Sequence, residues 1–325
     1  MSCTDTPGST GRILRIRLDM AGRRLDQVLA DMLPEFSRSR LQQWIDAGCV
    51  RVDGAACRRR DKVRGGEEVC LSLVLEPREE CQAQAIPLQV VYEDEQLLVV
   101  NKPADFVVHP AAGNPDGTLQ NALLHYAPEL DPLPRAGIVH RLDKDTTGLL
   151  VVAKTLQAHK SLVEQLHRRS VHREYRALVT GVLVAGGIVD APIGRHPVYR
   201  TRMAVVASGR RAVTHYRVHE RFAAHTLLAV KLETGRTHQI RVHMAHIRHP
   251  LVGDRTYGGR SRPVKGADPR LTEALQGCPR QALHAISLGL EHPATGEAMR
   301  WEIPMAADMD DLLTLLRMGV GHGVD

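Results

Sequence analysis

The sequence is poor in aromatic residues, and it has no paired cysteines and no long hydrophobic run. Aromatic side chains make up 3% of its 325 residues, which argues against binding single-stranded nucleic acid mainly by successive base stacking. No apolar stretch approaches the roughly eighteen residues of a membrane span, and the first eleven residues do not resemble a secretory signal. The six cysteines include no C-x-x-C pair, so we expect reduced thiols and no metal site built on them. These absences predict a cytoplasmic protein with no membrane partner.

Length and charge suggest a chain of two ordinary globular domains. Its 325 residues are 43% hydrophobic and 25% charged, which excludes wholesale disorder and allows a sizeable core. The formal net charge of +6 mildly favours a polyanionic partner.

Composition shifts along the chain predict a small domain followed by a large one. A helical apolar pattern begins at Arg24, and Ser37 is a suitable N-cap for a second helix before a short strand and turn at 49–54. Further on, polar sequence without periodicity predicts a linker. The predicted order is a disordered leader over residues 1–12, the small domain over 13–75, the linker over 76–87, the large domain over 88–318 and a frayed tail over 319–325.

In the large domain, strand-like runs outnumber helical ones. The helical patterns cover Leu119–Tyr126, Leu156–Arg168, Thr237–Ile247 and Met309–Met318. Many strands with few crossover helices predict an α+β fold built on a mixed, mostly antiparallel sheet.

The small domain carries a basic segment. Residues 36–64 hold eight lysines and arginines against three aspartates, a net charge of +5. On charge alone, a solvated surface is the more common explanation of such a segment, and a phosphate-binding face is the alternative. The arginines that would form this face are Arg38, Arg40, Arg58, Arg59 and Arg60.

The motifs around these arginines favour the phosphate-binding face. R-L-D at 24–26, S-R-S-R-L at 37–41, G-x-V-x-V-D-G at 48–54 and V-x-G-G-E at 63–67 follow one another. This order resembles the S4 RNA-binding module over most of residues 16–75. The resemblance implies two helices that carry basic residues, a small sheet, and RNA binding by the five arginines.

The most informative segment of the chain is H-R-L-D-K-D-T-T-G at residues 140–148. It places two carboxylates and three basic side chains within six residues and leads directly into the apolar run at 149–152. A loop anchored to a core strand is a good place to present a nucleophile or a base. From spacing alone, however, a charged turn whose members neutralise one another is the stronger explanation.

The order of several motifs decides between these two explanations. H-R-L-D-x-x-T-[ST]-G-L-x-V-x-A-K, here residues 140–154, resembles the signature of the RluA-type pseudouridine synthases. N-K-P at 101–103, R-E-Y at 173–175 and E-T-G-R-T-H-Q-I-R-V-H-M at 233–244 match the same family. The similarity extends from about residue 24 to about residue 316, and several motifs in the right order are more specific than one short pattern.

The resemblance implies isomerisation of uridine to pseudouridine by a monomer that acts on 23S ribosomal RNA or on a large-subunit assembly intermediate. It assigns the catalytic carboxylate to Asp143, the guanidinium beside it to Arg241, and the ring that stacks on the displaced uracil to Tyr175. Because the reaction needs neither a redox step nor a group donor, we expect no cofactor.

The same resemblance assigns further residues to RNA. Arg141 matches an arginine that wedges into the RNA and contacts phosphate, a role that suits an enzyme whose target base must leave its stack. His140 and Lys154 lie in the same motif and are assigned to RNA binding with it.

The chemistry explains why the catalytic carboxylate needs an arginine. Desolvation in a dry pocket raises the pKa of a carboxyl group, and a fixed guanidinium reverses this effect and holds one orientation. Asp145 is the competing carboxylate, which we expect to serve the loop. Without the family resemblance, Tyr175 is equally well explained as a buried strand tyrosine.

Two other features admit more than one interpretation. Histidines 238, 243, 246 and 249 have near-helical spacing, but arginines and no carboxylate lie among them, so a structural or RNA-facing role is favoured over metal binding. Residues 194–219 hold six arginines and no acid, which fits a basic arm on RNA better than a solvated hairpin. The alternative functions are a catalytically silent S4-type RNA-binding or ribosome-assembly factor and a metal-dependent hydrolase.

Overall fold

The computed structural model describes residues 10–33, 36, 38–73, 81–111, 113–259 and 268–318. The chain divides between residues 80 and 81 into two compact units, each with its own hydrophobic core. Within the described ranges, no helix is both long enough and apolar enough to cross a bilayer.

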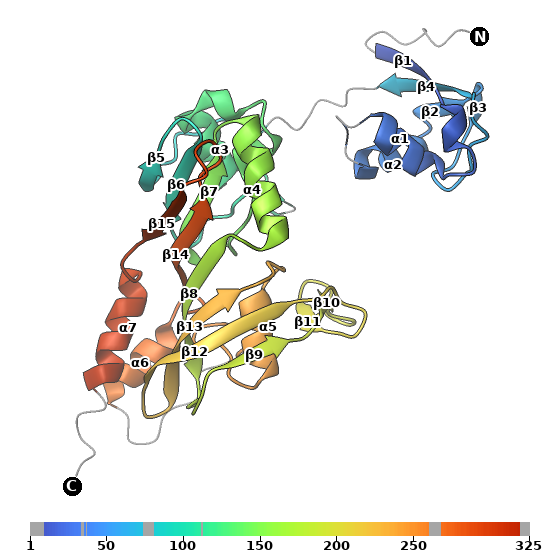
Figure 1. Ribbon diagram of the computed structural model, residues 1–325. Coiled ribbons are helices and arrows are strands. Elements are labelled where there is room, and N and C mark those ends of the chain that lie inside the picture. Colours follow the sequence, from blue (N-terminus) through green and yellow to red (C-terminus); the bar gives the residue numbers. More distant parts are fainter. Residues whose placement is uncertain are drawn as a thin grey trace. The chain divides into compact units, whose positions relative to one another are not determined.

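The first unit is a small antiparallel sheet with two helices (Figure 1). Its elements are β1 (Thr10–Arg15), the 3-10 turn η1 (Leu18–Met20), α1 (Leu25–Met32), α2 (Arg38–Asp46), β2 (Val50–Val52), β3 (Ala55–Ala56) and β4 (Glu68–Leu73). Its strands lie in the order β1-β4-β2-β3, and apolar side chains of both helices share one core with Val50, Val69 and Leu71 of the sheet. The predicted small domain of two helices and a sheet is therefore confirmed.

The start of this unit differs from the sequence-based prediction. Residues 10–12 belong to β1 and pair with β4, so the prediction of a leader over residues 1–12 is wrong for these three; residues 1–9 and the predicted N-cap Ser37 lie outside the described part of the chain. The predicted turn is confirmed at Asp53 and Gly54, whose φ angles of 50° and 75° are those of a two-residue hairpin between β2 and β3.

The second unit is built on one large sheet. Its strands are β5 (Val90–Glu93), β6 (Leu97–Lys102), β7 (Thr147–Ala153), β8 (His172–Thr180), β9 (Gly187–Asp190), β12 (Val213–Arg221), β13 (His225–Leu232), β14 (Leu283–Glu291) and β15 (Ala298–Glu302). Among the described residues, they lie in the order β5-β6-β7-β14-β8-β13-β12-β9, with β15 paired to β14. Neighbours are antiparallel except β7 and β14, which are parallel, so the predicted mixed, mostly antiparallel sheet is confirmed.

Helices and a separate hairpin complete this unit. They are α3 (Leu119–Tyr126), η2 (Pro128–Leu130), η3 (Pro134–Gly137), α4 (Leu156–Arg168), the hairpin β10 (Ile193–Arg195) and β11 (Met203–Val205), α5 (Gln239–His246), α6 (Pro269–Gly277) and α7 (Ala307–Met318). The bounds of α3 and α4 are those predicted, and α5 and α7 differ from their predicted ranges by one or two residues at an end. The sequence-based prediction missed α6 and the short strands β5, β9, β10 and β11.

Strand β7 lies in the middle of the core and fixes the segment that precedes it. All its residues are buried; Leu150 packs in the cluster that contains α3, and Leu149 in the cluster that contains α4. At its start, Gly148 has a φ of 113°, and a Cβ there would lie 2.3 Å from the carbonyl oxygen of Ala285 in β14. Only glycine permits this approach.

Part of the predicted linker belongs to the second unit. The N–H of Gln84 donates to the carbonyl of Asn121 in α3 at 3.0 Å, and the Asn121 side chain donates to the carbonyl of Gln82 at 2.8 Å. Cys81 and Ile86 pack against the main core. The prediction of a linker over 76–87 is therefore wrong for residues 81–87, and residues 74–80 lie outside the described ranges.

Asp26 is a fully buried carboxylate at the start of α1. It accepts hydrogen bonds from Arg24 at 3.0 Å, from Arg38 at 2.7 Å and from Gln42 at 2.6 Å. Burial raises the pKa of this carboxyl, but the hydrogen bonds outweigh burial and lower the pKa to about 2. Asp26 therefore joins α1 to α2, and it occupies much of the guanidinium of Arg38.

We expect Asp26→Asn to destabilise the first unit by about 2–4 kcal/mol, because the amide leaves the guanidinium of Arg38 without its buried counter-charge. The folded-state pKa lies below the ordinary value of 3.8. The carboxylate therefore stabilises the unit above about pH 4, and this contribution is lost as the pH falls toward 2. Urea unfolding followed through Trp44, in a Trp301→Phe background, measures both effects.

The matched control is Asp19→Asn, which removes an exposed carboxylate paired with Arg17. Exposed pairs contribute little, so its unfolding midpoint should be nearly unchanged. Equal losses at positions 19 and 26 would contradict the role given to the buried carboxylate.

Candidate active site

The backbone of the segment 140–146 is held from two sides. Lys102, a buried residue at the end of β6, donates hydrogen bonds from Nζ to three backbone carbonyls at 2.6–2.8 Å, one of them that of Lys144. Burial lowers the pKa of Lys102 to about 7. On the other side, Arg280 Nη1 donates to the carbonyl of Asp145 at 3.0 Å. The loop that carries Asp143 is therefore rigid, as a site for chemistry requires.

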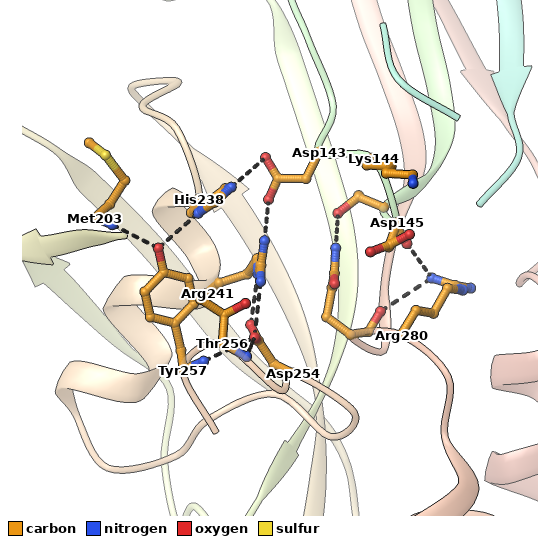
Figure 2. A network of polar contacts seen from close by, with 12 residues as sticks. Asp143, Lys144, Asp145, Met203, His238, Arg241, Asp254, Thr256, Tyr257 and Arg280 are labelled. Atoms are coloured by element: carbon orange, nitrogen blue, oxygen red, sulfur yellow. Dashed lines mark hydrogen bonds and ion pairs between the residues drawn. The ribbon is translucent and has the colours of Figure 1, made fainter. Parts of the chain in front are cut away.

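One guanidinium, that of Arg241 in α5, serves two carboxylates (Figure 2). Its Nε and Nη2 bind both oxygens of Asp254 at 2.7 and 3.0 Å, and its Nη1 donates to Oδ2 of Asp143 at 3.3 Å. The Asp254 side chain is 0% exposed and that of Asp143 is 14% exposed. Burial disfavours the charge of Arg241, but the two aspartates outweigh burial and raise its pKa above the ordinary value. Asp254 thus fixes the guanidinium, and the guanidinium orients Asp143.

His238 and Tyr257 form a second connection to Asp143. His238 Nδ1 lies 2.8 Å from Tyr257 Oη, which accepts the backbone N–H of Met203 at 2.9 Å. We assign the hydroxyl proton to the Oη–Nδ1 hydrogen bond, which puts the imidazole proton on Nε2, 4.0 Å from Asp143 Oδ1. Burial lowers the pKa of His238, so the ring is neutral at pH 7. The Tyr257 ring also lies 5.1 Å from the guanidinium of Arg241.

A cavity of about 610 Å³, a size typical of small-ligand sites, brings Asp143, His238 and Arg241 together with Tyr175. Tyr175 lies on β8 and is 5% exposed. Burial raises the pKa of its phenol, so the hydroxyl is protonated at neutral pH and can donate a hydrogen bond. The cavity therefore combines an oriented carboxylate with an aromatic ring and a proton donor.

Five residues predicted from the sequence line this cavity. They are Asp143, Tyr175, Arg241, Arg141 and His140. Arg141 is exposed at its edge. His140 is half-buried, and its Nε2 accepts the N–H of Val151 in β7 at 3.1 Å. Burial lowers the pKa of His140 to about 3, so this residue is a neutral anchor of the loop, and its contact with RNA stays a prediction.

Lys154 does not line this cavity, and its predicted contact with RNA stays a prediction. It follows the far end of β7 and forms an ion pair with Glu93 at 2.6 Å. Because a strand rises about 3.3 Å per residue, the length of β7 separates Lys154 from the loop 140–146. Its ammonium group joins β7 to β5.

The predicted arginines of the first unit divide between the fold and the surface. Arg38 binds Asp26, and the guanidinium of Arg40 lies 5.3 Å from the ring of Trp44. Arg38 is itself exposed, as are Arg58, Arg59 and Arg60. RNA binding by these side chains stays a prediction.

The sequence analysis missed three members of the site. Asp254 stands in a segment that the family resemblance includes, but no role was assigned to it, and nothing around Tyr257 signals one. His238 was predicted, with three other histidines, to have a structural or RNA-facing role rather than to bind metal, and no link to Asp143 was foreseen. Of the other histidines, His243 is buried between Thr214 Oγ1 and the carbonyl of Ala191, at 2.8 and 2.9 Å, which is a structural role.

Two known families match this chain. The S4 domain matches residues 23–69, and the RNA pseudouridylate synthase family matches residues 96–246. The second match includes Asp143, Tyr175 and Arg241. Fold and site thus define an RNA pseudouridylate synthase that carries an S4 domain.

Individual proteins that are similar to this chain indicate the kind of pseudouridine synthase more closely. Ribosomal large subunit pseudouridine synthase D of Pseudomonas aeruginosa is 58% identical over 94% of this chain and 96% of its own length. Its namesake in Escherichia coli (strain K12) is 56% identical over 91% of each chain. Among solved structures, Human RNA Pseudouridylate Synthase Domain Containing 4 aligns with a TM-score of 0.56 at 26% identity, over 70% of this chain and 93% of that one. This chain belongs to the family of RNA pseudouridine synthases that includes the D enzymes, and these enzymes are isomerases.

We expect Arg241→Lys to lower the rate of pseudouridine formation by about 100-fold, because an ammonium group cannot bind Asp254 in a fork and reach Asp143 as well. Release of tritium from RNA that carries 5-tritiated uridine measures the rate. Arg168→Lys replaces an exposed arginine of α4 that pairs with Glu164 and should leave the rate unchanged. Full activity of Arg241→Lys would show that the fork is not needed.

Asp254→Asn tests the anchor behind this arginine. We expect a loss of about tenfold or more in rate with little change in RNA affinity, because the guanidinium stays in the site but loses its counter-charge and its fixed orientation. Single-turnover rates and RNA binding are measured in parallel. A loss of affinity at an unchanged rate would contradict a positioning role.

Proposed function

We propose that this protein isomerises specific uridines of large-subunit (23S) ribosomal RNA to pseudouridine, and that it acts as a cytoplasmic monomer on the RNA or on a large-subunit assembly intermediate. The observation that carries the proposal is Asp143, oriented by Arg241 in a cavity that also holds Tyr175. The choice of RNA is supported by the names of relatives that share more than half of their residues with this chain.

The reaction breaks the bond between uracil N1 and ribose C1′, turns the base, and joins C5 to C1′. The N1–C1′ electron pair leaves with the uracil. After the new bond forms, C5 loses its proton and N1 gains one, so no atom is added or removed. Asp143 supplies the lone pair that starts the reaction, as a nucleophile or as a general base, and Arg241 keeps that lone pair pointed into the cavity.

Two neighbours of Asp143 suit the rest of the task. The ring of Tyr175 offers a flat face for the uracil, and its protonated hydroxyl can take part in proton transfer. Arg141 is exposed at the edge of the cavity, where it can contact phosphate and occupy the place of a base that has left its stack.

The test of this function is a map of pseudouridines in ribosomal RNA. Cells that lack the gene should lose pseudouridine at particular large-subunit positions, and the wild-type gene should restore it. Asp143→Asn should fail to restore it, because the loss of the lone-pair donor lowers the rate by more than about 1,000-fold. Asp145→Asn is the matched control and should restore modification, since the carbonyl rather than the carboxylate of Asp145 is used by Arg280.

An unchanged map in cells without the gene would refute the substrate. Restoration by Asp143→Asn would refute the catalytic assignment and would favour an RNA-binding or assembly factor instead.

We further expect the S4 unit to position the enzyme through phosphate contacts. Deletion of residues 1–80, which keeps the segment 81–87 that packs on α3, should weaken RNA binding and reduce its salt dependence. The slope of log K against log[salt] falls by about 0.7–0.9 for each phosphate that the shortened chain no longer neutralises. Pseudouridine formation should persist at high enzyme concentration.

Binding and activity at several salt concentrations, for the full and the shortened chain, test this expectation. An unchanged slope would mean that Arg58, Arg59 and Arg60 do not contact RNA. A folded but inactive shortened chain would mean that the first unit helps to build the active site.

A further inference from the structure

Arg173 in β8 is a buried cation that has no counter-charge in the described part of the chain. The residue is 9% exposed, and its Nε is a buried donor with no hydrogen-bond partner there. No carboxylate of the described residues forms an ion pair with it, whereas Arg241 is paired with Asp254 and Arg280 with Asp308. Burying an unpaired charge is strongly unfavourable. A buried cation without a counter-charge therefore indicates a site where a bound ligand supplies the negative charge or the hydrogen-bond acceptor.

The position of Arg173 identifies that ligand as the one that enters the active site. Arg173 lines the same cavity as Asp143 and Tyr175. Because side chains two apart in a strand share a face, Arg173 lies beside Tyr175 on the cavity side of β8, about 7 Å along the strand. Gly235 leaves room for its guanidinium, since a Cβ there would lie 3.0 Å from Arg173 Nη1.

Within the proposed function, the ligand has two kinds of negative charge. The phosphates lie on the outside of an RNA, where the exposed Arg141 can meet them. The deeply placed Arg173, beside the ring proposed to stack on the uracil, faces the base instead. When the N1–C1′ bond breaks, the bonding pair leaves with the base, and its negative charge spreads over N1 and the two carbonyl oxygens.

We propose that Arg173 binds a carbonyl oxygen of the target uracil and stabilises the negative charge that the base acquires as the glycosidic bond breaks. Arg173 would then be a catalytic residue distinct from Asp143, Tyr175 and Arg241. A buried guanidinium in a site from which the bound base excludes water acts more strongly on the charge that develops in the transition state than on the neutral base in the ground state. The inference rests on the proposed isomerisation but does not depend on which RNA is the substrate.

The test compares Arg173→Met with Arg176→Met in the full chain. Arg176 lies on the opposite face of β8, is similarly buried, and pairs with Glu174 at 2.6 Å. On total RNA from cells that lack the gene, Arg173→Met should lower the single-turnover rate by about 100- to 1,000-fold, with RNA affinity unchanged within about threefold. Arg176→Met should keep the wild-type rate within about threefold. Arg173→Lys keeps a charge but loses the planar fork, so its rate should lie between those of the wild type and Arg173→Met.

Measurements of melting temperature and of activity on a modified substrate distinguish a catalytic role of Arg173 from a structural one. Removal of an unpaired buried charge should leave the melting temperature of Arg173→Met unchanged or higher. Fluorine at C5 withdraws charge and makes uracil a better leaving group, so on RNA with 5-fluorouridine the rate defect, measured as loss of that nucleoside, should shrink at least tenfold. Gly235→Ala, which pushes the guanidinium aside, should show the same pattern in weaker form.

Other outcomes overturn the proposal. A lower melting temperature of Arg173→Met would show that Arg173 has a structural role. A loss of RNA affinity at an unchanged rate would show that it contacts phosphate. Equal rate defects on uridine and 5-fluorouridine would show that Arg173 does not stabilise the charge on the departing uracil. If wild-type protein formed no pseudouridine in total RNA or in large-subunit assembly intermediates from these cells, the proposed function would fail and this inference with it.

Discussion

The active site depends on one guanidinium shared between two carboxylates. Asp254 is fully buried and occupies two of the nitrogens of Arg241, which leaves Nη1 for Asp143. Because the arginine is already neutralised by Asp254, its contact with Asp143 orients the carboxylate without fully quenching its charge. A carboxylate whose orientation is fixed and whose negative charge is not fully neutralised remains a good nucleophile or base.

The scaffold supplies this arrangement from segments that are far apart in the chain. Asp143 precedes the fully buried strand β7, Arg241 lies in α5, and Asp254 follows α5. Lys102 and Arg280 fix the loop backbone through its carbonyl groups, so they set its position without using the carboxylate of Asp143, which Arg241 binds. Tyr175 and Arg173 come from β8, which the sheet places between β14 and β13.

The sequence contained enough information for the architecture and for the centre of the site. Long periodic segments such as Leu119–Tyr126 are clear because tertiary contacts reinforce their local pattern, and the motifs around Asp143 and Arg241 carried the family resemblance. Elements of three or four residues, such as β9, have too few side chains to show a period. Helix α6 has a usable signal in its Asp268 cap, which the sequence analysis overlooked.

What could not be predicted is set by packing between distant segments. Asp254 gains its role from Arg241 in α5, and Tyr257 gains its role from contacts with α5, its N-cap and β11. The lack of an ion pair at Arg173 among the described residues is likewise visible only once its surroundings are known. Lys154 lies apart from the cavity for a geometric reason. A motif that runs from a loop through a whole strand has its first and last residues at opposite ends of that strand.

Gly148 links the sheet to the chemistry in a further way. Its missing side chain lets β7 approach the backbone of β14 at Ala285, and the parallel pairing of these strands includes this point. The spacing between the loop and the neighbouring strand is therefore set by the two backbones alone, because Gly148 has no side chain that could change its rotamer. Side chains elsewhere in the core can be exchanged and repacked during evolution, but Gly148 has no smaller residue that could replace it and no larger one that fits. The fold should therefore tolerate little change at Gly148, although this residue carries no functional group.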